Sequence, residues 1–209
     1  MSQSSELISL STEGESKTGV FIFGGFALAI GRVPPFEFLK TMSTNFADLD
    51  AHIYIDPSRS WYSEGFQGIT SNTDETVEYL KEKIKDYERV VFMGVSSGGY
   101  AAMLFGSLLE ADRVVAFVPQ TDLRYGNIGQ TKGRIKNEYR DILPYVNDTT
   151  EYHLYVNEED TSAMHHPYHI DRVVELGKDN VHRKTIIKDL KHMRDNGMLV
   201  DLLRDVFYN

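Results

Sequence analysis

The chain has 209 residues, of which 41% are hydrophobic and 25% charged, a composition typical of one globular domain with a sizeable core. Its 31 acidic and 22 basic side chains give a formal net charge of −9, which disfavours nucleic acid as a partner. The absence of cysteine excludes disulfides, thiolate metal sites and a cysteine nucleophile. The polar first residues do not resemble a secretory signal, and no stretch approaches the ~20 apolar residues that cross a bilayer. We therefore expect a cytoplasmic protein without a membrane span.

Short apolar runs alternate with helical patterns along the chain. The predicted strands are 19–23, 51–55, 89–93, 114–118, 151–156 and 184–187, and the predicted helices are 36–42, 74–87, 100–110, 167–176 and 196–207. This alternation, with strands that are apolar on both faces, predicts a three-layer α/β/α sandwich around a mostly parallel, doubly wound sheet. No linker or repeat divides the chain, so we expect one domain over 1–209. Its polar segment 1–17 could add a first edge strand.

A glycine-flanked serine joins the third predicted strand to the helix that follows it. The residues Gly94-Val95-Ser96-Ser97-Gly98 match the pattern G-x-S-x-G between an apolar strand and a helix-forming segment. Such a serine occupies a tight, strained turn, where side chains two positions before and after it would collide, and only glycine leaves that space. Ser97 has Val95 at the earlier of these positions, so Ser96 is the better nucleophile. The alternative is a glycine-rich turn without chemistry.

The order of chemical groups along the chain resembles that of the α/β-hydrolase superfamily. A strand, the Ser96 turn and a helix are followed by an acid after a later strand and a histidine after the last strand. The resemblance extends from about residue 19 onward and implies an α/β-hydrolase fold with little or no cap domain. It also implies that Asp160, after the strand 151–156, orients the catalytic histidine. Glu159 is the second candidate for this acid, and Asp122 is the third.

A serine hydroxyl becomes a strong nucleophile only when a base removes its proton. Seven histidines compete for this role, at positions 52, 153, 165, 166, 169, 182 and 192. His52 and His153 lie inside predicted strands, and His182 precedes its strand, at the other edge of the sheet. His192 follows the last predicted strand and precedes the terminal helix, which is where the superfamily carries its catalytic histidine. We therefore predict a triad of Ser96, Asp160 and His192.

Two backbone N–H groups are the expected oxyanion donors. One is that of Ser97, directly after the nucleophile, and the resemblance implies a second from the loop after an early strand. Phe26 fits this second role, because Gly24 and Gly25 allow close approach of the backbone. The superfamily often has His-Gly here, whereas this chain has Phe23 before the glycines.

Aromatic side chains follow the second predicted strand, at the sheet edge where the nucleophile is expected. Trp61 and Tyr62, a few residues past Asp56, could line the substrate pocket together with Gly25. Packing in the core is an equal alternative for the two aromatic rings.

The sequence does not predict a metal or cofactor site. The histidines at 165, 166 and 169 include the i, i+4 spacing used for zinc, but Pro167 favours a helix that begins after His165. The glycines around Ser96 do not form a dinucleotide-binding turn, because that turn needs glycine where Ser96 stands. We predict no metal and no cofactor.

These features together predict a carboxylesterase-like serine hydrolase that cleaves an ester through an acyl-enzyme intermediate. Its substrate would be a small molecule or an exposed acyl ester. A thioesterase or acyltransferase could use the same triad, and a catalytically silent binding protein could share the fold. The acyl group, the alcohol and the oligomeric state are not fixed by the sequence.

Overall fold

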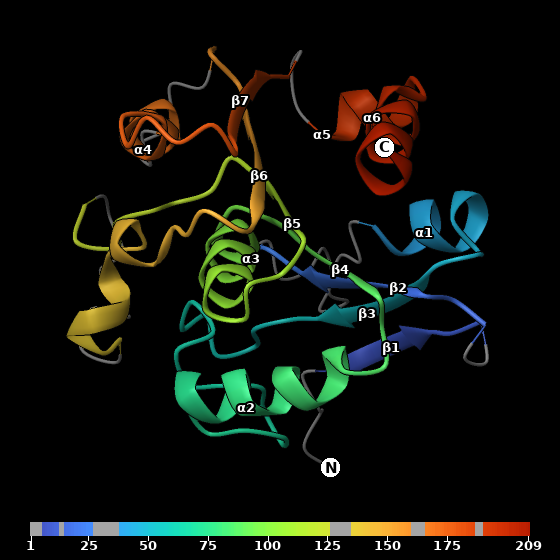
Figure 1. The fold of residues 1–209 in the computed structure, drawn as a ribbon, viewed down its shortest axis with the longest axis horizontal. Coiled ribbons are helices and arrows are strands. Elements are labelled where there is room, and N and C mark those ends of the chain that lie inside the picture. Colours follow the sequence, from blue (N-terminus) through green and yellow to red (C-terminus); the bar gives the residue numbers. More distant parts are fainter. Residues whose placement is uncertain (1–5, 13–14, 27–37, 126–134, 160–165, 187–189) are drawn as a thin grey trace.

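A computed structural model describes residues 6–12, 15–26, 38–125, 135–159, 166–186 and 190–209. Within these ranges, strands and helices alternate as expected (Figure 1). The strands are β1 (Glu6–Leu10), β2 (Thr18–Phe23), β3 (Asp50–Tyr54), β4 (Arg89–Val95), β5 (Arg113–Phe117), β6 (Glu151–Val156) and β7 (Val181–Thr185). The α-helices are α1 (Leu39–Asn45), α2 (Thr73–Ile84), α3 (Ser97–Leu108), α4 (His166–Val174), α5 (Leu190–Asp195) and α6 (Met198–Tyr208). The first five predicted strands are found within two residues at each end.

One sheet holds all of these strands, in the order β1-β3-β2-β4-β5-β6-β7. The strands β2 to β7 pair in parallel, whereas β1 pairs antiparallel with β3 at the edge. The edge strand β1 falls within the polar segment 1–17. The expectation of a mostly parallel sheet is confirmed.

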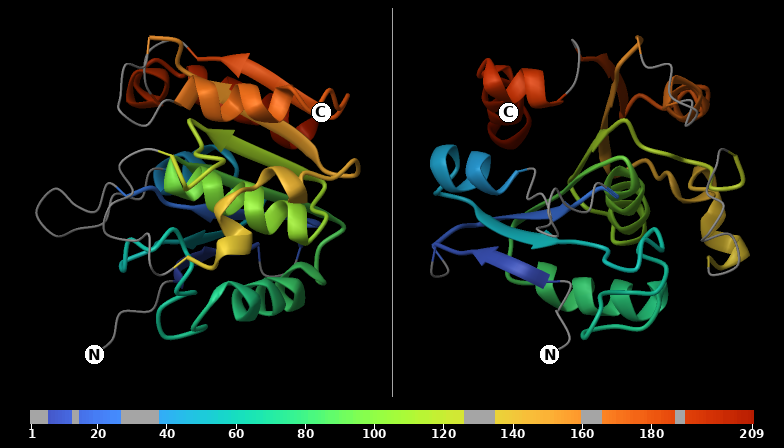
Figure 2. Two further views of the ribbon diagram at one scale, coloured as in Figure 1. Left: turned by 90° about the vertical axis from the view of Figure 1, so that its left-hand side faces the viewer. Right: turned by 180° about the vertical axis from the view of Figure 1, so that it is seen from behind.

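The sheet lies between two layers of helices (Figures 1 and 2). Successive side chains of a strand point to opposite faces, so β4 contributes Phe92 to one core cluster and Val91 and Met93 to the other. The helices α2, α3 and α4 cover the face of Phe92, and α1, α5 and α6 cover the opposite face. The predicted three-layer α/β/α sandwich is thereby confirmed, and the two covering layers explain why the central strands are apolar on both faces.

The helix that follows Ser96 is the most buried helix of the described chain. Every residue of α3 except Leu108 is buried, and the small residues Ala101, Ala102 and Gly106 allow it to lie close to the strands. A Cβ on Gly106 would come within 2.4 Å of a methyl group of Val114. Close packing of α3 on the sheet therefore fixes where its first turn lies.

The segment between β5 and β6 packs beside α3. Its described part contains two short 3₁₀ helices, η1 (Asn137–Arg140) and η2 (Leu143–Tyr145). Ile142 and Val146 join the core cluster of α3. The Tyr100 hydroxyl donates a hydrogen bond of 2.6 Å to the carbonyl of Tyr139.

The last strand and the terminal helix differ from the sequence-based expectation. Strand β7 spans Val181–Thr185 rather than 184–187, so His182 lies inside a strand and does not precede it. The reason is that β7 is the edge strand and its side chains are half-buried or exposed, so it carries no apolar run.

The predicted helix 196–207 is α6, preceded by the short helix α5, and Gly197 between them has φ +77°. No helix among the described residues has both the length and the apolar content needed to span a bilayer.

Candidate active site

The predicted nucleophile lies on a strained turn between a strand and a helix. Strand β4 ends at Val95 and α3 begins at Ser97, with Ser96 between them at φ 54° and ψ −115°. A positive φ is uncommon for any residue with a Cβ and costs of order 1–3 kcal/mol. The surrounding structure must therefore impose this conformation.

The two glycines of the motif explain how the conformation is imposed. A Cβ on Gly94 would lie 2.1 Å from the carbonyl oxygen of Gly98, and a Cβ on Gly98 would lie 2.0 Å from the carbonyl oxygen of Phe23. Only glycine fits at either position. The first turn of α3 is thus in close contact with the end of β2. Ser96, which joins β4 to α3, adopts a positive φ to allow this contact.

The same close contact brings the loop after β2 beside the turn. The Cβ position of Gly98 is also within 2.9 Å of the carbonyl oxygen of Gly24, and Gly24 donates its N–H to Tyr54 at 2.9 Å. Gly25 and Phe26 continue from this point and are half-buried. On the other side, Ser97 is the first residue of α3, where a backbone N–H has no acceptor within the helix and the helix dipole is positive. The two predicted donor segments are therefore neighbours.

Trp61 and Tyr62 lie in the core beneath this loop. Each is 1% exposed, and the Trp61 ring packs edge-on against Phe26 with centroids 4.7 Å apart. The Tyr62 hydroxyl donates to the Gly24 carbonyl at 2.8 Å, while its backbone N–H donates to the Asp56 carboxylate at 3.0 Å. Both aromatic residues hold positive φ values of 59°. They support the loop from below, and their role as pocket residues stays a prediction.

The Ser96 hydroxyl donates a long hydrogen bond to Gln120, a residue for which the sequence predicted no role. Its acceptor is Gln120 Oε1, at 3.4 Å. Gln120 is fully buried and follows the end of β5. The chain bends there at Val118, with φ 43°, and the Ser96 N–H donates to the Phe117 carbonyl at 2.9 Å. The position of Gln120, just past a buried strand, was the only feature of the sequence that pointed to it.

The predicted base lies in α5, and the predicted acid lies outside the described residues. His192 is half-buried, with Nδ1 at 3.4 Å from the side-chain nitrogen of Asn196. Within the described residues, the Ser96 hydroxyl donates to Gln120 and His192 Nδ1 lies beside Asn196, so the pairing of Ser96 with His192 stays a prediction. Asp160 is not among the residues that the structure describes, and the second candidate acid, Glu159, is exposed. The assembly of the triad therefore stays a prediction.

The third candidate acid, Asp122, is engaged in a network of ion pairs. Its buried carboxylate accepts hydrogen bonds from Arg124 at 2.8 and 2.6 Å, and Arg172 lies at 3.5 Å. Both arginines also contact Asp141. Burial opposes ionisation of Asp122, but the hydrogen bonds and charge of Arg124, helped by Arg172, outweigh it and hold the pKa of this carboxyl below its usual value. This network ties the loop after β5 to α4.

Of the three histidines at 165, 166 and 169, the structure describes only the side chain of His169. His169 is buried, and its Nδ1 accepts the backbone N–H of Thr121 at 3.1 Å, so this nitrogen is already occupied. His165 lies outside the described residues, and of His166 only the backbone is described. Elsewhere in the described chain, Glu151, His153 and His182 converge near the amino ends of β6 and β7.

Comparisons with known proteins bear on the fold. No family model and no curated protein matches the sequence, but solved structures match it closely in shape. A lipase/esterase from Lactobacillus plantarum matches with a TM-score of 0.61 at 13% identity. The match covers 90% of this chain and 84% of the esterase chain. The capsule O-acetyltransferase of Neisseria meningitidis serogroup A has a TM-score of 0.64 at 14% identity, covering 92% of this chain and 87% of its own.

The chain has the α/β-hydrolase fold. The strand order, with β1 antiparallel at one edge, and the serine turn after β4 agree with this assignment. A third match, a glycosylation-associated protein complex (Gap123) from Streptococcus agalactiae, has a TM-score of 0.63 at 12% identity and covers 94% of this chain. This chain spans only 43% of that longer one.

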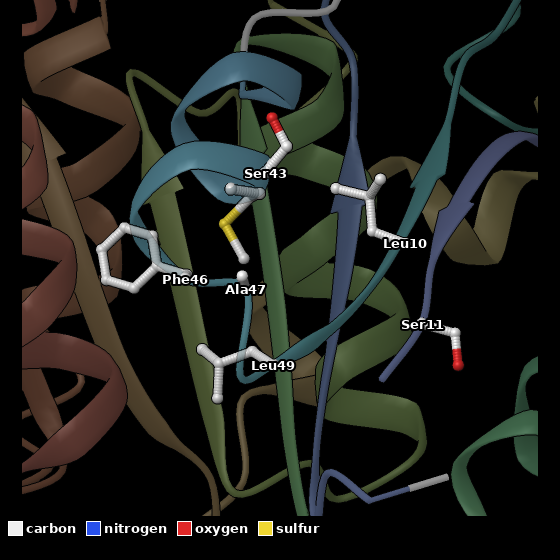
Figure 3. Close-up of a pocket in the computed structure, with 7 residues that line it drawn as sticks. Leu10, Ser11, Ser43, Phe46, Ala47 and Leu49 are labelled. Carbon is white, nitrogen blue, oxygen red and sulfur yellow. The ribbon is translucent and has the colours of Figure 1, made fainter. Parts of the chain in front are cut away.

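The pocket in Figure 3 lies away from Ser96. It has a volume of about 390 Å³ and lies between β1 and α1, lined by Leu10, Ser11, Met42, Ser43, Phe46, Ala47 and Leu49. The lining residues Ala47 and Leu49 precede β3, so the pocket lies toward the amino end of that strand. Ser96, in contrast, follows the carboxyl end of β4. Substrate for Ser96 would not bind in this pocket.

Replacing Gly98 with alanine tests the close contact at the nucleophile turn. The new Cβ would meet the backbone of β2, which cannot rotate away, so we expect the free energy of unfolding to fall by about 2–3 kcal/mol. Urea denaturation measures this change. The matched control is Gly177→Ala, where a Cβ meets nothing within 4 Å and only the φ of +67° is unfavourable, so a loss of about 1 kcal/mol is expected. Equal losses in the two variants would contradict the steric argument.

Replacing Asp122 with asparagine tests the ion-pair network. Because the folded pKa of Asp122 is lowered, its charge stabilises the fold above the unfolded pKa, near 4, and this contribution disappears as the pH falls through the folded pKa. We expect Asp122→Asn to lower the free energy of unfolding by about 1–2 kcal/mol at pH 7, after allowance for the half-exposed Arg124. Denaturation at pH 7 and at progressively lower pH should show the difference shrinking. A pH-independent difference would show that the charge contributes nothing.

Proposed function

We propose that this chain is a serine hydrolase that cleaves an ester bond, with Ser96 as nucleophile, His192 as base and Asp160 as the orienting acid. The observation that carries the proposal is the backbone of Ser96, held at φ 54° between a buried strand and a buried helix. Backbone strain of this kind clusters at functional sites, and it presents the hydroxyl beyond the carboxyl ends of the strands. The half-buried Ser96 is accessible from that edge.

The chemistry follows from these roles. Ser96 Oγ attacks the acyl carbonyl carbon as His192 takes the hydroxyl proton, and the N–H groups of Phe26 and Ser97 stabilise the oxyanion. Collapse of this intermediate breaks the bond to the alcohol, which leaves with the proton from His192. Water then attacks the acyl-serine, giving one proton to His192, and the acid leaves as that proton returns to Ser96. No cofactor is needed in any step.

The proposed reaction requires that the His192 imidazole replace Gln120 as the hydrogen-bond partner of the Ser96 hydroxyl. Ser96 is hydrogen-bonded to Gln120 at 3.4 Å, a weak contact that an approaching imidazole can replace. Catalytic hydrogen bonds in unliganded enzymes are often long and tighten only in the complex with substrate. The described residues 135–146 pack against α3, which supports a site without a large lid and a substrate whose ester is exposed.

The similarity to an esterase supports the ester as the bond cleaved, and the similarity to an O-acetyltransferase favours a second candidate. An acyltransferase would form the same acyl-serine and pass the acyl group to a hydroxyl of an acceptor instead of to water. The two functions differ only in the second nucleophile. A silent binding protein would form no acyl-serine.

Labelling with a fluorophosphonate probe tests the nucleophile. We expect wild-type protein to be labelled and Ser96→Ala to be unlabelled, with hydrolysis of p-nitrophenyl esters at least about 10³-fold slower in Ser96→Ala and in His192→Ala. The matched control is Ser43→Ala, because Ser43 is an exposed serine on α1 whose hydroxyl donates to the carbonyl of Lys40 in the same helix; this variant should label as wild type. Undiminished labelling of Ser96→Ala, or no labelling of folded wild-type protein, would contradict the proposal.

Partition of the acyl group between water and an added alcohol distinguishes the two enzymes. With a p-nitrophenyl ester as donor and a sugar alcohol as acceptor, a hydrolase should release mainly free acid, whereas an acyltransferase should form mainly the new ester. Mass spectrometry of the products measures the ratio, with Ser96→Ala as the control for uncatalysed transfer. Free acid as the main product at high acceptor concentration supports the hydrolase.

A further inference from the structure

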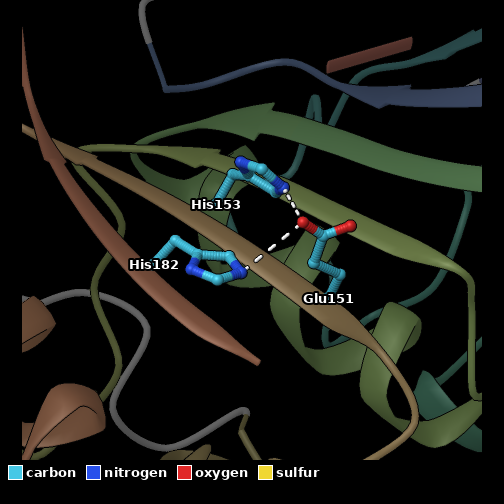
Figure 4. Close-up of side chains that lie close together, drawn as sticks. All are labelled: Glu151, His153 and His182. Atoms are coloured by element: carbon cyan, nitrogen blue, oxygen red, sulfur yellow. Dashed lines mark hydrogen bonds and ion pairs between the residues drawn. The ribbon is translucent and has the colours of Figure 1, made fainter. Parts of the chain in front are cut away.

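Three potential metal ligands lie together on one face of the sheet, at the edge opposite Ser96 (Figure 4). Glu151 and His153 are two residues apart on β6, so both side chains point to the same face. His182 on β7 is the direct register partner of His153, and neighbours across a strand pair have Cβ atoms about 5 Å apart. Rigid backbone therefore supplies all three side chains.

The donor atoms are already close to the geometry of a metal shell. Glu151 Oε1 lies 2.8 Å from His153 Nε2 and 3.5 Å from His182 Nε2, and the three ligand atoms all lie within 4.8 Å of one another. A tetrahedral shell with bonds of about 2.0 Å separates its ligands by roughly 3.3 Å. Small side-chain rotations would suffice to place an ion between them.

Arg113 fixes the orientation of the Glu151 carboxylate in this cluster. Arg113 holds the other oxygen, Glu151 Oε2, with its Nε at 2.8 Å, and it also donates to the carbonyl of Val206 near the end of α6. This leaves Oε1 directed at both imidazoles. Partners of this kind, which fix a ligand through its second oxygen, raise the selectivity and affinity of metal sites.

A hydrogen-bonded cluster without an ion is the competing interpretation. One histidine would satisfy Oε1, and His153 does so, yet His182 reaches the same oxygen from the neighbouring strand. Two imidazoles and one carboxylate form a known ligand set for zinc in proteins, with a fourth position left for water. His182 is 40% exposed at its side chain, so solvent can reach that position.

We propose that Glu151 Oε1, His153 Nε2 and His182 Nε2 bind one divalent transition metal ion, with Zn²⁺ as the best fit to this ligand set. The ion would tie the edge strand β7 to β6 and, through Arg113, to the end of α6. Binding at Nε2 leaves the proton on Nδ1 of His153, which is buried and has no partner among the described residues. That unpaired group weakens binding by about 10- to 100-fold, so we expect a Kd in roughly the micromolar range.

Calorimetric titration of Zn²⁺ into untagged, chelator-treated full-length protein tests the site. Wild type should bind one ion per chain and rise in Tm with Zn²⁺ concentration, and His182→Ala and Glu151→Gln should bind at least about 10-fold more weakly. His182→Ala is the decisive variant, because the side chain is half-exposed and its loss leaves the core intact. The matched control is Lys184→Ala, a neighbour on β7 that is not a ligand, which should bind as tightly as wild type or more so.

Two results would overturn the proposal. One is the absence of saturable binding to wild-type protein up to millimolar Zn²⁺. The other is an unchanged affinity in His182→Ala, which would assign the binding to other histidines. Neither result bears on Ser96, because fluorophosphonate labelling is measured separately.

Discussion

The approach of α3 to the end of β2 is the constraint on which the rest of this structure depends. Gly98 lies against the carbonyl oxygens of Phe23 and Gly24 with no room for a methyl group. This contact sets the direction of α3, forces Ser96 into a left-handed conformation and brings the loop that carries Phe26 beside Ser97. One packing contact therefore positions both Ser96 and the loop after β2.

The strain at Ser96 is balanced by the structure around it. Helix α3 is buried along almost its whole length, so it cannot shift to relax the turn. The loop after β2 is fixed in the same way: Tyr62 holds the Gly24 carbonyl, and Asp56 holds the Tyr62 backbone. Further positive φ values, at Trp61, Tyr62 and Val118, occur beside the same turn. Strain concentrated in this manner is typical of functional sites, where rigid surroundings over-determine the backbone.

Much of this arrangement could be predicted from local sequence, because it depends on local rules. Buried parallel strands are continuous apolar runs, and glycine is required wherever backbone approaches backbone, so the strands β2 to β6 and the Ser96 turn followed directly. The edge strand β7 did not, since its half-exposed side chains produce no apolar run. That error hid the cluster of Glu151, His153 and His182, because a strand at 184–187 leaves His182 outside the sheet. The contacts of Gln120 and Asp122 depend on tertiary approach, for which the sequence has no periodic pattern.

The strand order separates the serine motif from the geometry that makes it useful. Strands β2 and β4 are neighbours in the sheet, but β3 and α2 lie between them in the chain, so their pairing closes a long loop. The fragment from β4 to α3 contains every residue of the motif and none of the carbonyls that Gly98 must meet. Isolated from β2, that fragment would lose the force that bends Ser96 and would relax to an ordinary turn. A shorter chain that contains the G-x-S-x-G pattern but no equivalent of β2 would therefore match this site in sequence and not in backbone conformation.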